Sequence, residues 1–241
     1  MKDNSIFLHQ LYSPGGAQGL AALKNAPNTH PHEWANRNPY TLVSMLKHSW
    51  SVNLPDLGTW VVEHIPSPVS NFPSLLAESM KYDNTYVSDF LLADFQKYTE
   101  QKVDEPKAQR IGLSAALDAA VFGKLEYLVK ITQIMRDYFF CGHFEDIASE
   151  GAGHTNVVQY CWENLSEKGK IHVASQVICA NNTDAIEWVA QRIPSLYWGD
   201  VELNLDDNQK TLWREHTSVV QHARLEEQTQ PAQFSAPSKK I

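Results

Sequence analysis

A sequence pattern typical of a pair of helices recurs three times between residues 114 and 193. This periodicity limits the possible folds of the chain more than any other feature. Gly123, Gly153 and Asn182 mark the three copies and lie 30 and 29 residues apart. A recurring helix-turn-helix unit of this length is typical of a solenoid rather than of a catalytic fold. After one or two polar residues, each copy continues with a short apolar run: Leu125, Leu128 and Val129; Val157, Val158 and Cys161; Ala185, Ile186 and Val189. A fainter fourth copy begins at Glu215, where EHTSVVQH matches GHTNVVQY from Gly153.

The first copy, SAALDAAVFG ending at Gly123, resembles the ankyrin-repeat phrase T-P-L-H-x-A-A-x-x-G because it keeps the Ala119–Ala120 pair and the glycine. Small residues let a helix press close to its neighbour, and a glycine just beyond it can take the left-handed conformation. The resemblance is degenerate and spans residues about 112–225. The Thr-Pro-Leu-His phrase is absent, the second copy has two extra residues around Gly151, and the third has Asn182 in place of the glycine and Ile178-Cys179 in place of the alanines.

We therefore expect a mostly α protein with three parts. Residues 1–110 form an irregular helical N-terminal part, residues 111–225 form a short helical solenoid of degenerate ankyrin-like repeats, and residues 226–241 form a disordered tail rich in Gln, Pro and Ser. The charged segment 99–110 marks the boundary between the first two parts. The alternative interpretation is an ordinary α-helical domain whose helices share a length.

The N-terminal part contains four predicted elements. Residues 41–50 are helical, 59–65 form either a strand or a compact turn of helix, and a helix starts near Asn71 with Pro73 in its first turn. Residues 84–98 form an amphipathic helix. Its predicted apolar face recurs every three or four residues and contains Val87, Phe90, Leu91, Asp94, Phe95 and Tyr98.

Charge and hydropathy exclude several classes of partner. The formal net charge of -8 opposes binding to nucleic acid or to an anionic membrane, and no run of 18 apolar residues is present. The 3 cysteines lack disulfide or zinc spacing, which favours a reducing compartment. Residues 1–10 contain too short an apolar run for a secretory signal. We expect a soluble protein that is cytoplasmic, or delivered into a host cell by a nonclassical route.

Two clusters have the residue types of a chemical site. His30, His32 and Glu33 provide imidazole and carboxylate ligands within four residues, and Cys141, His143, Glu145 and Asp146 provide a thiol with a base. A solvated turn explains the first cluster more simply, and triad partners usually meet across a fold rather than within a few residues. We therefore expect no catalytic residue, metal or cofactor.

Aromatic residues in the segments between repeats indicate the function. An ankyrin-like array, as the resemblance implies, binds another protein through the turns joining its units and the adjacent face of the first helices. These segments contain Tyr138, Phe139 and His143, and further along Tyr197 and Trp198. Because aromatic side chains dominate binding hot spots, we expect these five residues to bind a partner protein, as in an adaptor or effector. Some of them can instead cap the repeat stack, and the sequence does not separate the two roles.

Two other functions remain open at this point. One is an enzyme, a hydrolase or a metal-dependent one, with its active site in residues 1–110 and the repeats recruiting substrate. Its support is the set of histidines before residue 65. The other is a structural subunit of an assembly. The sequence leaves the oligomeric state undetermined.

Overall fold

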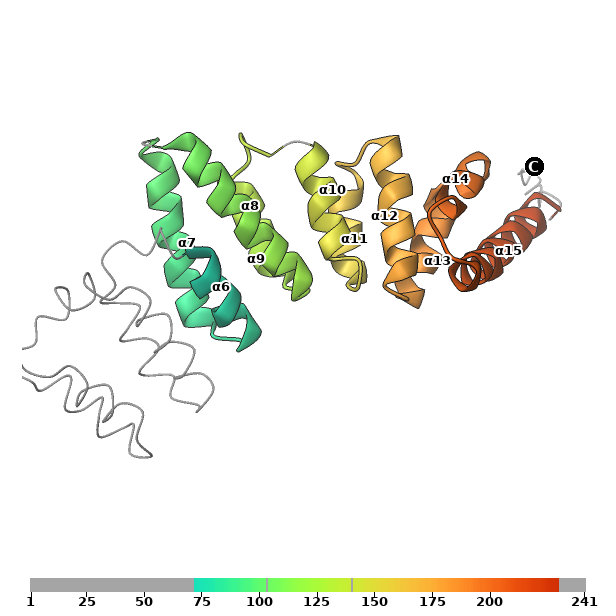
Figure 1. Ribbon diagram of the computed structural model, residues 1–241, viewed down its shortest axis with the longest axis horizontal. Helices are drawn as coiled ribbons and strands as arrows, with labels where there is room; N and C mark the ends of the chain where they lie inside the picture. Colours follow the sequence, from blue (N-terminus) through green and yellow to red (C-terminus); the bar gives the residue numbers. More distant parts are fainter. Residues whose placement is uncertain (1–71, 103, 140, 230–241) are drawn as a thin grey trace, which may run out of the picture. The chain divides into compact units, whose positions relative to one another are not determined.

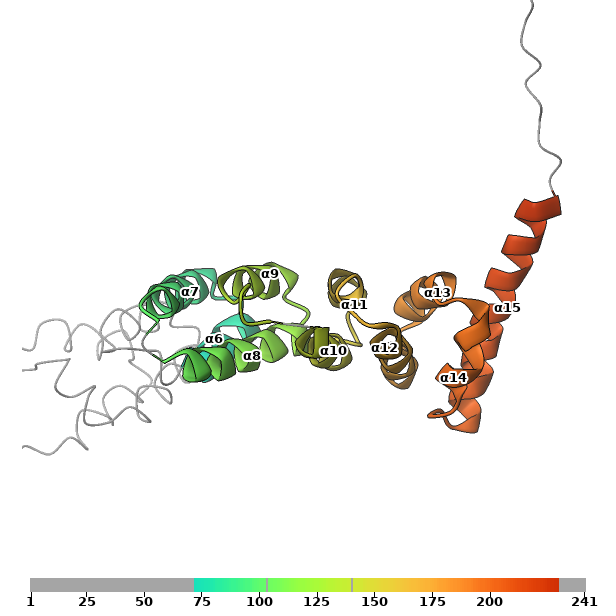
Figure 2. The ribbon, with the colours of Figure 1, turned by 90° about the horizontal axis from the view of Figure 1, so that it is seen from above.

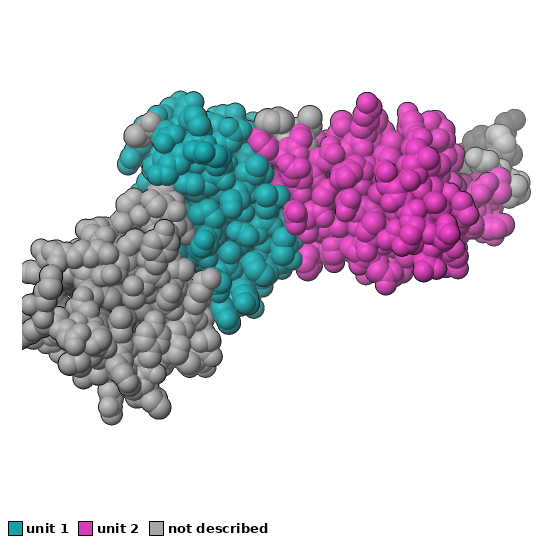
Figure 3. Space-filling model, in the orientation of Figure 1, with its two compact units in different colours: residues 1–139 teal, residues 140–241 magenta. Residues whose placement is uncertain are grey.

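The computed structural model describes residues 72–102, 104–139 and 141–229 of the chain. These residues form helices and no strand, so the predicted mostly α class is confirmed for them (Figure 1). They belong to two compact units that divide between Phe139 and Phe140 (Figure 3). The elements predicted at 41–50 and 59–65 lie outside the described residues.

The described part of unit 1 consists of two stacked helical hairpins. Helix α6 (Phe72–Lys81) pairs with α7 (Thr85–Glu100), and α8 (Glu105–Val121) pairs with α9 (Leu125–Ile134). The hairpins stack because α6 contacts α8 and α7 contacts α9, which produces the two rows seen in Figure 2. The helices predicted from Asn71 and over 84–98 are present as α6 and α7. Helices α6 and α7 form a regular hairpin. The sequence analysis instead predicts that residues 1–110 form an irregular helical part.

Unit 2 contains two further hairpins and a C-terminal cap. The hairpins are α10 (Cys141–Glu150) with α11 (Thr155–Trp162), and α12 (Glu167–Cys179) with α13 (Thr183–Arg192). Helix α10 contacts α12, and α11 contacts α13, again in two rows (Figure 2). The cap comprises the 3-10 turn η2 (Ser195–Tyr197), α14 (Trp198–Glu202) and α15 (Asp207–Thr229). Helix α15 packs on α12 and α13, and it includes the first residues of the segment 226–241 that was expected to be disordered.

The same turn closes three of the four hairpins. Its central residue is Asp83, Gly123 or Asn181, with a φ of 55°, 65° or 53°. In each case the N–H of that residue donates to the carbonyl three residues earlier, and the next N–H donates to the carbonyl five residues earlier. This bonding satisfies carbonyls that the end of a helix leaves without partners. Gly123 therefore has its predicted left-handed conformation, and the α6–α7 hairpin shares the turn although Asp83 is not a glycine.

The other two predicted anchors behave differently. Asn182 does not replace the closing glycine; that position belongs to Asn181, and Asn182 is the N-cap of α13, where its Oδ1 accepts from the Ala185 N–H at 3.2 Å. Gly153 has no positive φ. The α10–α11 hairpin closes instead with a bond from the His154 N–H to the Gly151 carbonyl at 2.8 Å.

Small residues let α8 approach its neighbours closely, as the sequence predicts. Ala119 and Ala120 are fully buried. At Gly112 the approach is closer still, since a Cβ there would lie 2.6 Å from Cγ of Met135. The absence of a side chain at this position therefore lets the residue after α9 pack against α8.

The apolar runs after each turn form much of the core. Leu128, all of the second run and all of the third are buried, whereas Leu125 and Val129 are half-buried. The predicted face of α7 is partly wrong. Val87, Leu91 and Phe95 are buried, but Phe90, Asp94 and Tyr98 are half-buried and Ser88, Leu92 and Thr99 take the remaining core positions. Contact with α6 rotates the face, and the Ser88 hydroxyl bonds that of Ser79 at 2.7 Å.

Candidate protein-interaction surface

The predicted binding residues of unit 1 lie just after α9. Tyr138 and Phe139 are both half-buried, and both N–H groups donate to the Met135 carbonyl, at 2.9 and 3.1 Å. The Tyr138 carbonyl in turn accepts from Nε2 of Gln109 on α8 at 3.3 Å. These bonds hold the backbone in place, and both side chains are only partly exposed.

His143 is not part of a surface connector. Helix α10 already begins at Cys141, and His143 lies on its buried side, one turn before the fully buried Ile147. Its side chain is 8% exposed, which leaves little for a partner to contact. The sequence analysis places His143 in a segment between repeats, and the helical spacing from His143 to Ile147 is the signal that would have assigned it to a helix.

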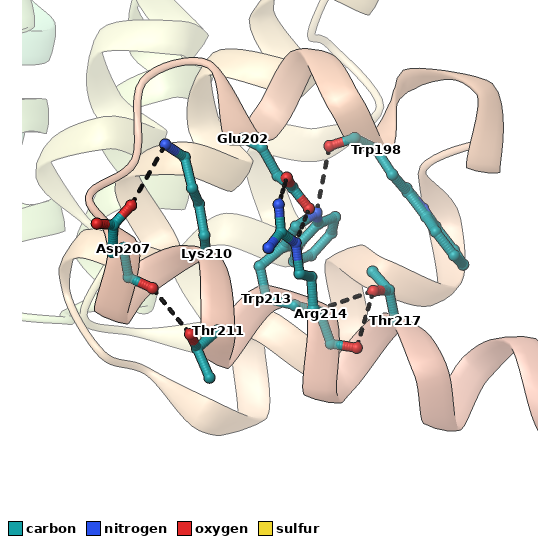
Figure 4. Close-up of polar contacts among 8 residues, drawn as sticks. All are labelled: Trp198, Glu202, Asp207, Lys210, Thr211, Trp213, Arg214 and Thr217. Carbon is teal, nitrogen blue, oxygen red and sulfur yellow. Dashed lines mark hydrogen bonds and ion pairs between the residues drawn. The ribbon is translucent and has the colours of Figure 1, made fainter.

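Trp198 anchors the cap of unit 2 (Figure 4). Its Nε1 donates to the Ile193 carbonyl at 3.2 Å, and its own carbonyl accepts from Nε1 of Trp213 at 3.3 Å. The two rings meet edge to face, with centroids 6.4 Å apart. The guanidinium of Arg224 lies 5.8 Å from the Trp198 ring. Of the two roles that the sequence leaves open for Trp198, these contacts favour capping.

An ion pair and a buried contact hold the other end of α14. Arg214 on α15 donates through Nε and Nη2 to the two carboxylate oxygens of Glu202, at 3.0 and 2.6 Å (Figure 4). These hydrogen bonds from Arg214 lower the pKa of the Glu202 carboxyl below its ordinary value. Between the two anchors Val201 is fully buried, and its carbonyl accepts from the Ser175 hydroxyl at 3.2 Å. The short helix is therefore fixed along its whole length.

The two most exposed large apolar side chains of the described residues flank this short helix, since Leu196 lies in η2 and Leu203 is the C-cap of α14. Leu196 is 73% exposed and Leu203 is 79% exposed. Since η2 runs directly into α14, residues seven apart lie on the same side, and Gly199 and Asp200 stand between the two leucines. Both are exposed, and a Cβ at Gly199 would meet nothing within 4 Å. We call Leu196, Gly199, Asp200 and Leu203 the leucine ridge.

Sequence reasoning named the neighbours of the ridge rather than the ridge itself. Tyr197 and Trp198 are half-buried, Val201 within α14 is fully buried, and Leu205 just beyond the helix is buried as well. Trp198, Val201 and Leu205 are three and four residues apart, which indicates one buried side of this segment and assigns Leu196 and Leu203 to the other. That signal was available, but the aromatic content of the segment was given more weight.

The two units differ in charge. Over residues 141–229 the sequence has 14 acidic residues against 6 lysines and arginines, a net charge of -8. Over residues 72–139 the numbers are 10 and 8, a net charge of -2. Unit 2, which carries the ridge, is therefore the acidic part of the described chain.

Unit 1 has a shallow groove of 380 Å³ between α7 and α9. Leu92, Ala93 and Ile134 form its apolar part, and Lys130 lies at its edge, bonded to Asp89 at 2.8 Å and Glu126 at 2.9 Å. These two carboxylates raise the pKa of Lys130, so its positive charge is already matched within the groove.

The described ranges lack the residue groupings of two other kinds of site. No group of three or more His, Cys, Asp or Glu side chains is placed there to hold a metal ion, and no helix in those ranges has the length and hydropathy to cross a membrane. The His30, His32 and Glu33 cluster lies outside the described residues. Comparison of the chain with protein-family models, with curated proteins and with solved structures finds no match.

Proposed function

We propose that this chain is a protein-binding module, built from ankyrin-like helical hairpins, that holds its partner at the leucine ridge of unit 2. The observation that carries the proposal is the exposure of Leu196 and Leu203 on a helix that is otherwise fixed. Burying a leucine side chain contributes about 1.5–3 kcal/mol. Two leucines on one side of a helix therefore provide a driving force for association.

The rigid attachment of the ridge strengthens this proposal. Binding is weakened when loops and side chains must be ordered as the complex forms. The bonds of Trp198 and Glu202 to α13 and α15 already order the backbone that presents the leucines. Tyr197, half-buried beside the ridge, adds an aromatic ring of the kind enriched in binding hot spots.

The hairpin architecture supports an ankyrin-like interpretation. Three hairpins share one turn, and each unit arranges its helices in two rows. In such arrays the segments that join successive hairpins stand at an edge, where a partner can reach them. The ridge belongs to the segment that follows the last hairpin, α12–α13.

Quantitative affinity purification with the full chain tests this function. The baits are the wild type, a Leu196→Ser/Leu203→Ser variant and a Val219→Ser variant, each incubated with extract of the source cells. Val219 is the matched control because it is 65% exposed on α15. We expect a set of proteins that the wild type and Val219→Ser retain and the double variant loses. If the double variant retains the same proteins, the ridge is not the binding surface.

A further inference from the structure

Asp200 gives the leucine ridge a charged centre. It follows Leu196 by four residues and precedes Leu203 by three, so its carboxylate lies between the two leucines on one side of the helix. It is exposed, and among the described residues it forms no ion pair. The nearby carboxylate of Glu202 is by contrast already bound to Arg214.

The surroundings of the ridge are also acidic. Asp206 and Asp207 begin α15 immediately beyond the ridge, and unit 2 as a whole has a net charge of -8. Asp206 exchanges hydrogen bonds with Gln209 through its backbone N–H and its Oδ1, at 2.9 and 2.8 Å, as a helix cap does.

This charge pattern selects among the possible occupants of the ridge. Two copies of the chain that met ridge to ridge about a twofold axis would bring one Asp200 towards the other, which is unfavourable. Anionic lipid and nucleic acid would be repelled by the whole unit. A positively charged protein surface would be attracted, and it would also gain the apolar contact of the leucines.

The open space at Gly199 bears on how closely a bound partner can approach the leucine ridge. Its φ is not in the left-handed region and a Cβ would meet nothing within 4 Å, so the fold of this chain does not require glycine here. The missing side chain leaves a gap between the leucines that the backbone of another chain can fill.

We propose that the leucine ridge binds a basic protein segment in which an arginine or lysine pairs with Asp200 and apolar groups on either side receive Leu196 and Leu203. The inference rests on the proposed function and adds the chemistry of the partner. Asp200 selects the charge of the segment, the leucines provide apolar contact, and Gly199 admits its backbone.

The test uses a displayed library of random peptides, selected on the full chain without any assumption about charge. We expect the selected peptides to contain arginine or lysine flanked by apolar residues. Their affinity is then measured by fluorescence anisotropy and should fall about tenfold or more with Asp200→Lys, because a close charge pair becomes a repulsion. A peptide whose basic residue is replaced by glutamate should regain affinity for Asp200→Lys. Selected peptides that lack basic residues, or that bind Asp200→Lys unchanged, overturn the inference.

Two leucine insertions test the gap at the ridge. Gly199→Leu places a side chain between Leu196 and Leu203 and should lower affinity about tenfold or more, as overpacking of a contact does. Gly153→Leu is the matched control, because that exposed glycine of unit 2 also has open space around a Cβ and no positive φ. Equal affinity of the two variants for the peptides contradicts the inference.

Hydrogen exchange with the bound peptide separates this inference from the proposed function. If the bound peptide slows hydrogen exchange only in residues 195–206, the result supports both the protein-binding function and the ridge as its site. Protection elsewhere in residues 141–229 overturns the inference about the ridge and leaves a protein-binding unit. A library that yields no binder overturns both. Sedimentation of the full chain completes the test, because a dimer that Leu203→Ser dissociates would show that the ridge binds a second copy instead.

Discussion

The two units hold their hairpins together by different kinds of contact. In unit 1, lysines of the second hairpin reach carboxylates of the first: Lys124 pairs with Asp83, and Lys130 pairs with Asp89. In unit 2, tryptophan rings make the equivalent contacts. Trp162 of α11 meets Trp188 of α13 edge to face at 5.3 Å, and Trp198 meets Trp213 in the cap.

This difference determines which acidic side chains are neutralised by lysines of the neighbouring hairpin. Where lysines bridge neighbouring hairpins, each one neutralises a carboxylate of the same unit. In unit 2 the lysine pairs are local, between Lys170 and Glu167 and between Lys210 and Asp207, each three residues apart on one helix. Unit 2 uses the acidic side chain of Glu202 to join α14 to Arg214 of α15, but Asp200 forms no ion pair among the described residues.

The largest expected effect is on the aromatic contact of unit 2. Trp213→Ala removes a fully buried ring and the bond to the Trp198 carbonyl, and it should lower the free energy of unfolding by about 3–5 kcal/mol. Urea unfolding followed by circular dichroism measures this loss. Val219→Ala, on the exposed side of α15, should change the value by less than about 0.5 kcal/mol. A loss below about 1 kcal/mol for Trp213→Ala would show that the cap is not held by its tryptophans.

Glycine replacements compare the tightness of packing in the two units. A Cβ at Gly151 of unit 2 would lie 2.4 Å from Cγ1 of Val157, a stiff β-branched side chain. At Gly112 of unit 1 it would meet Met135, whose flexible side chain can move. Gly151→Ala should therefore lower the free energy of unfolding by about 1–3 kcal/mol, and Gly112→Ala by less. If Gly151→Ala and Gly112→Ala lowered the free energy of unfolding equally in thermal or urea unfolding, the two units would not differ in tightness of packing at these glycines.

The lysine bridges of unit 1 should give a smaller and salt-dependent effect. Lys130→Gln removes the pairs with Asp89 and Glu126 at the surface and should lower the free energy of unfolding by about 0.2–1 kcal/mol. The difference should shrink at about 1 M NaCl, where screening is strong. Lys168→Gln is the control, since Lys168 has no ion pair within the described ranges. A loss that does not depend on salt would mean that packing of the lysine stem, and not its charge, is responsible.

The smallest effect concerns the acid sensitivity of the cap. Hydrogen bonds from Arg214 lower the pKa of Glu202, so the folded state binds the proton less tightly than the unfolded state does. The stabilisation is therefore present above the ordinary carboxyl pKa and is lost as the pH falls through the lowered value. The wild type should be more stable than Glu202→Gln near about pH 7 and equal to it near about pH 2. An unchanged difference across this range would show that Glu202 does not act through its charge.

The structural features that the sequence predicted correctly depend on local side-chain chemistry. The alanine pair of α8, the left-handed Gly123 and the apolar runs follow from side-chain size and helical spacing alone. The sequence predicted both helices of the α6–α7 hairpin but not its likeness to the later hairpins, because its turn uses Asp83, and a residue other than glycine in the left-handed conformation gives a weak signal. The third turn was placed one residue late for the same reason, since Asn181 and Asn182 are chemically alike.

Tertiary packing decided the rest. The bonds from Trp198 to the Ile193 carbonyl and from Trp213 to the Trp198 carbonyl depend on how α13, α14 and α15 pack together, which no local pattern reveals. His143 was misplaced because the first turn of α10 has few helix-forming signals. Tyr138, Phe139, Tyr197 and Trp198 are half-buried, so the most exposed apolar side chains of the described residues are instead those of Leu196 and Leu203.

The inward and outward sides of the segment around α14 differ in how well they should tolerate substitution. Trp198 and Val201 face inward and hold the helix in place, whereas Leu196, Gly199 and Leu203 contribute little to the interior of their own chain. Substitutions on the outer side can therefore accumulate without unfolding the unit. Related chains could acquire new partners by exchanging a few outer side chains on an unchanged support, and a protein engineer could randomise the same positions to obtain binders of chosen specificity.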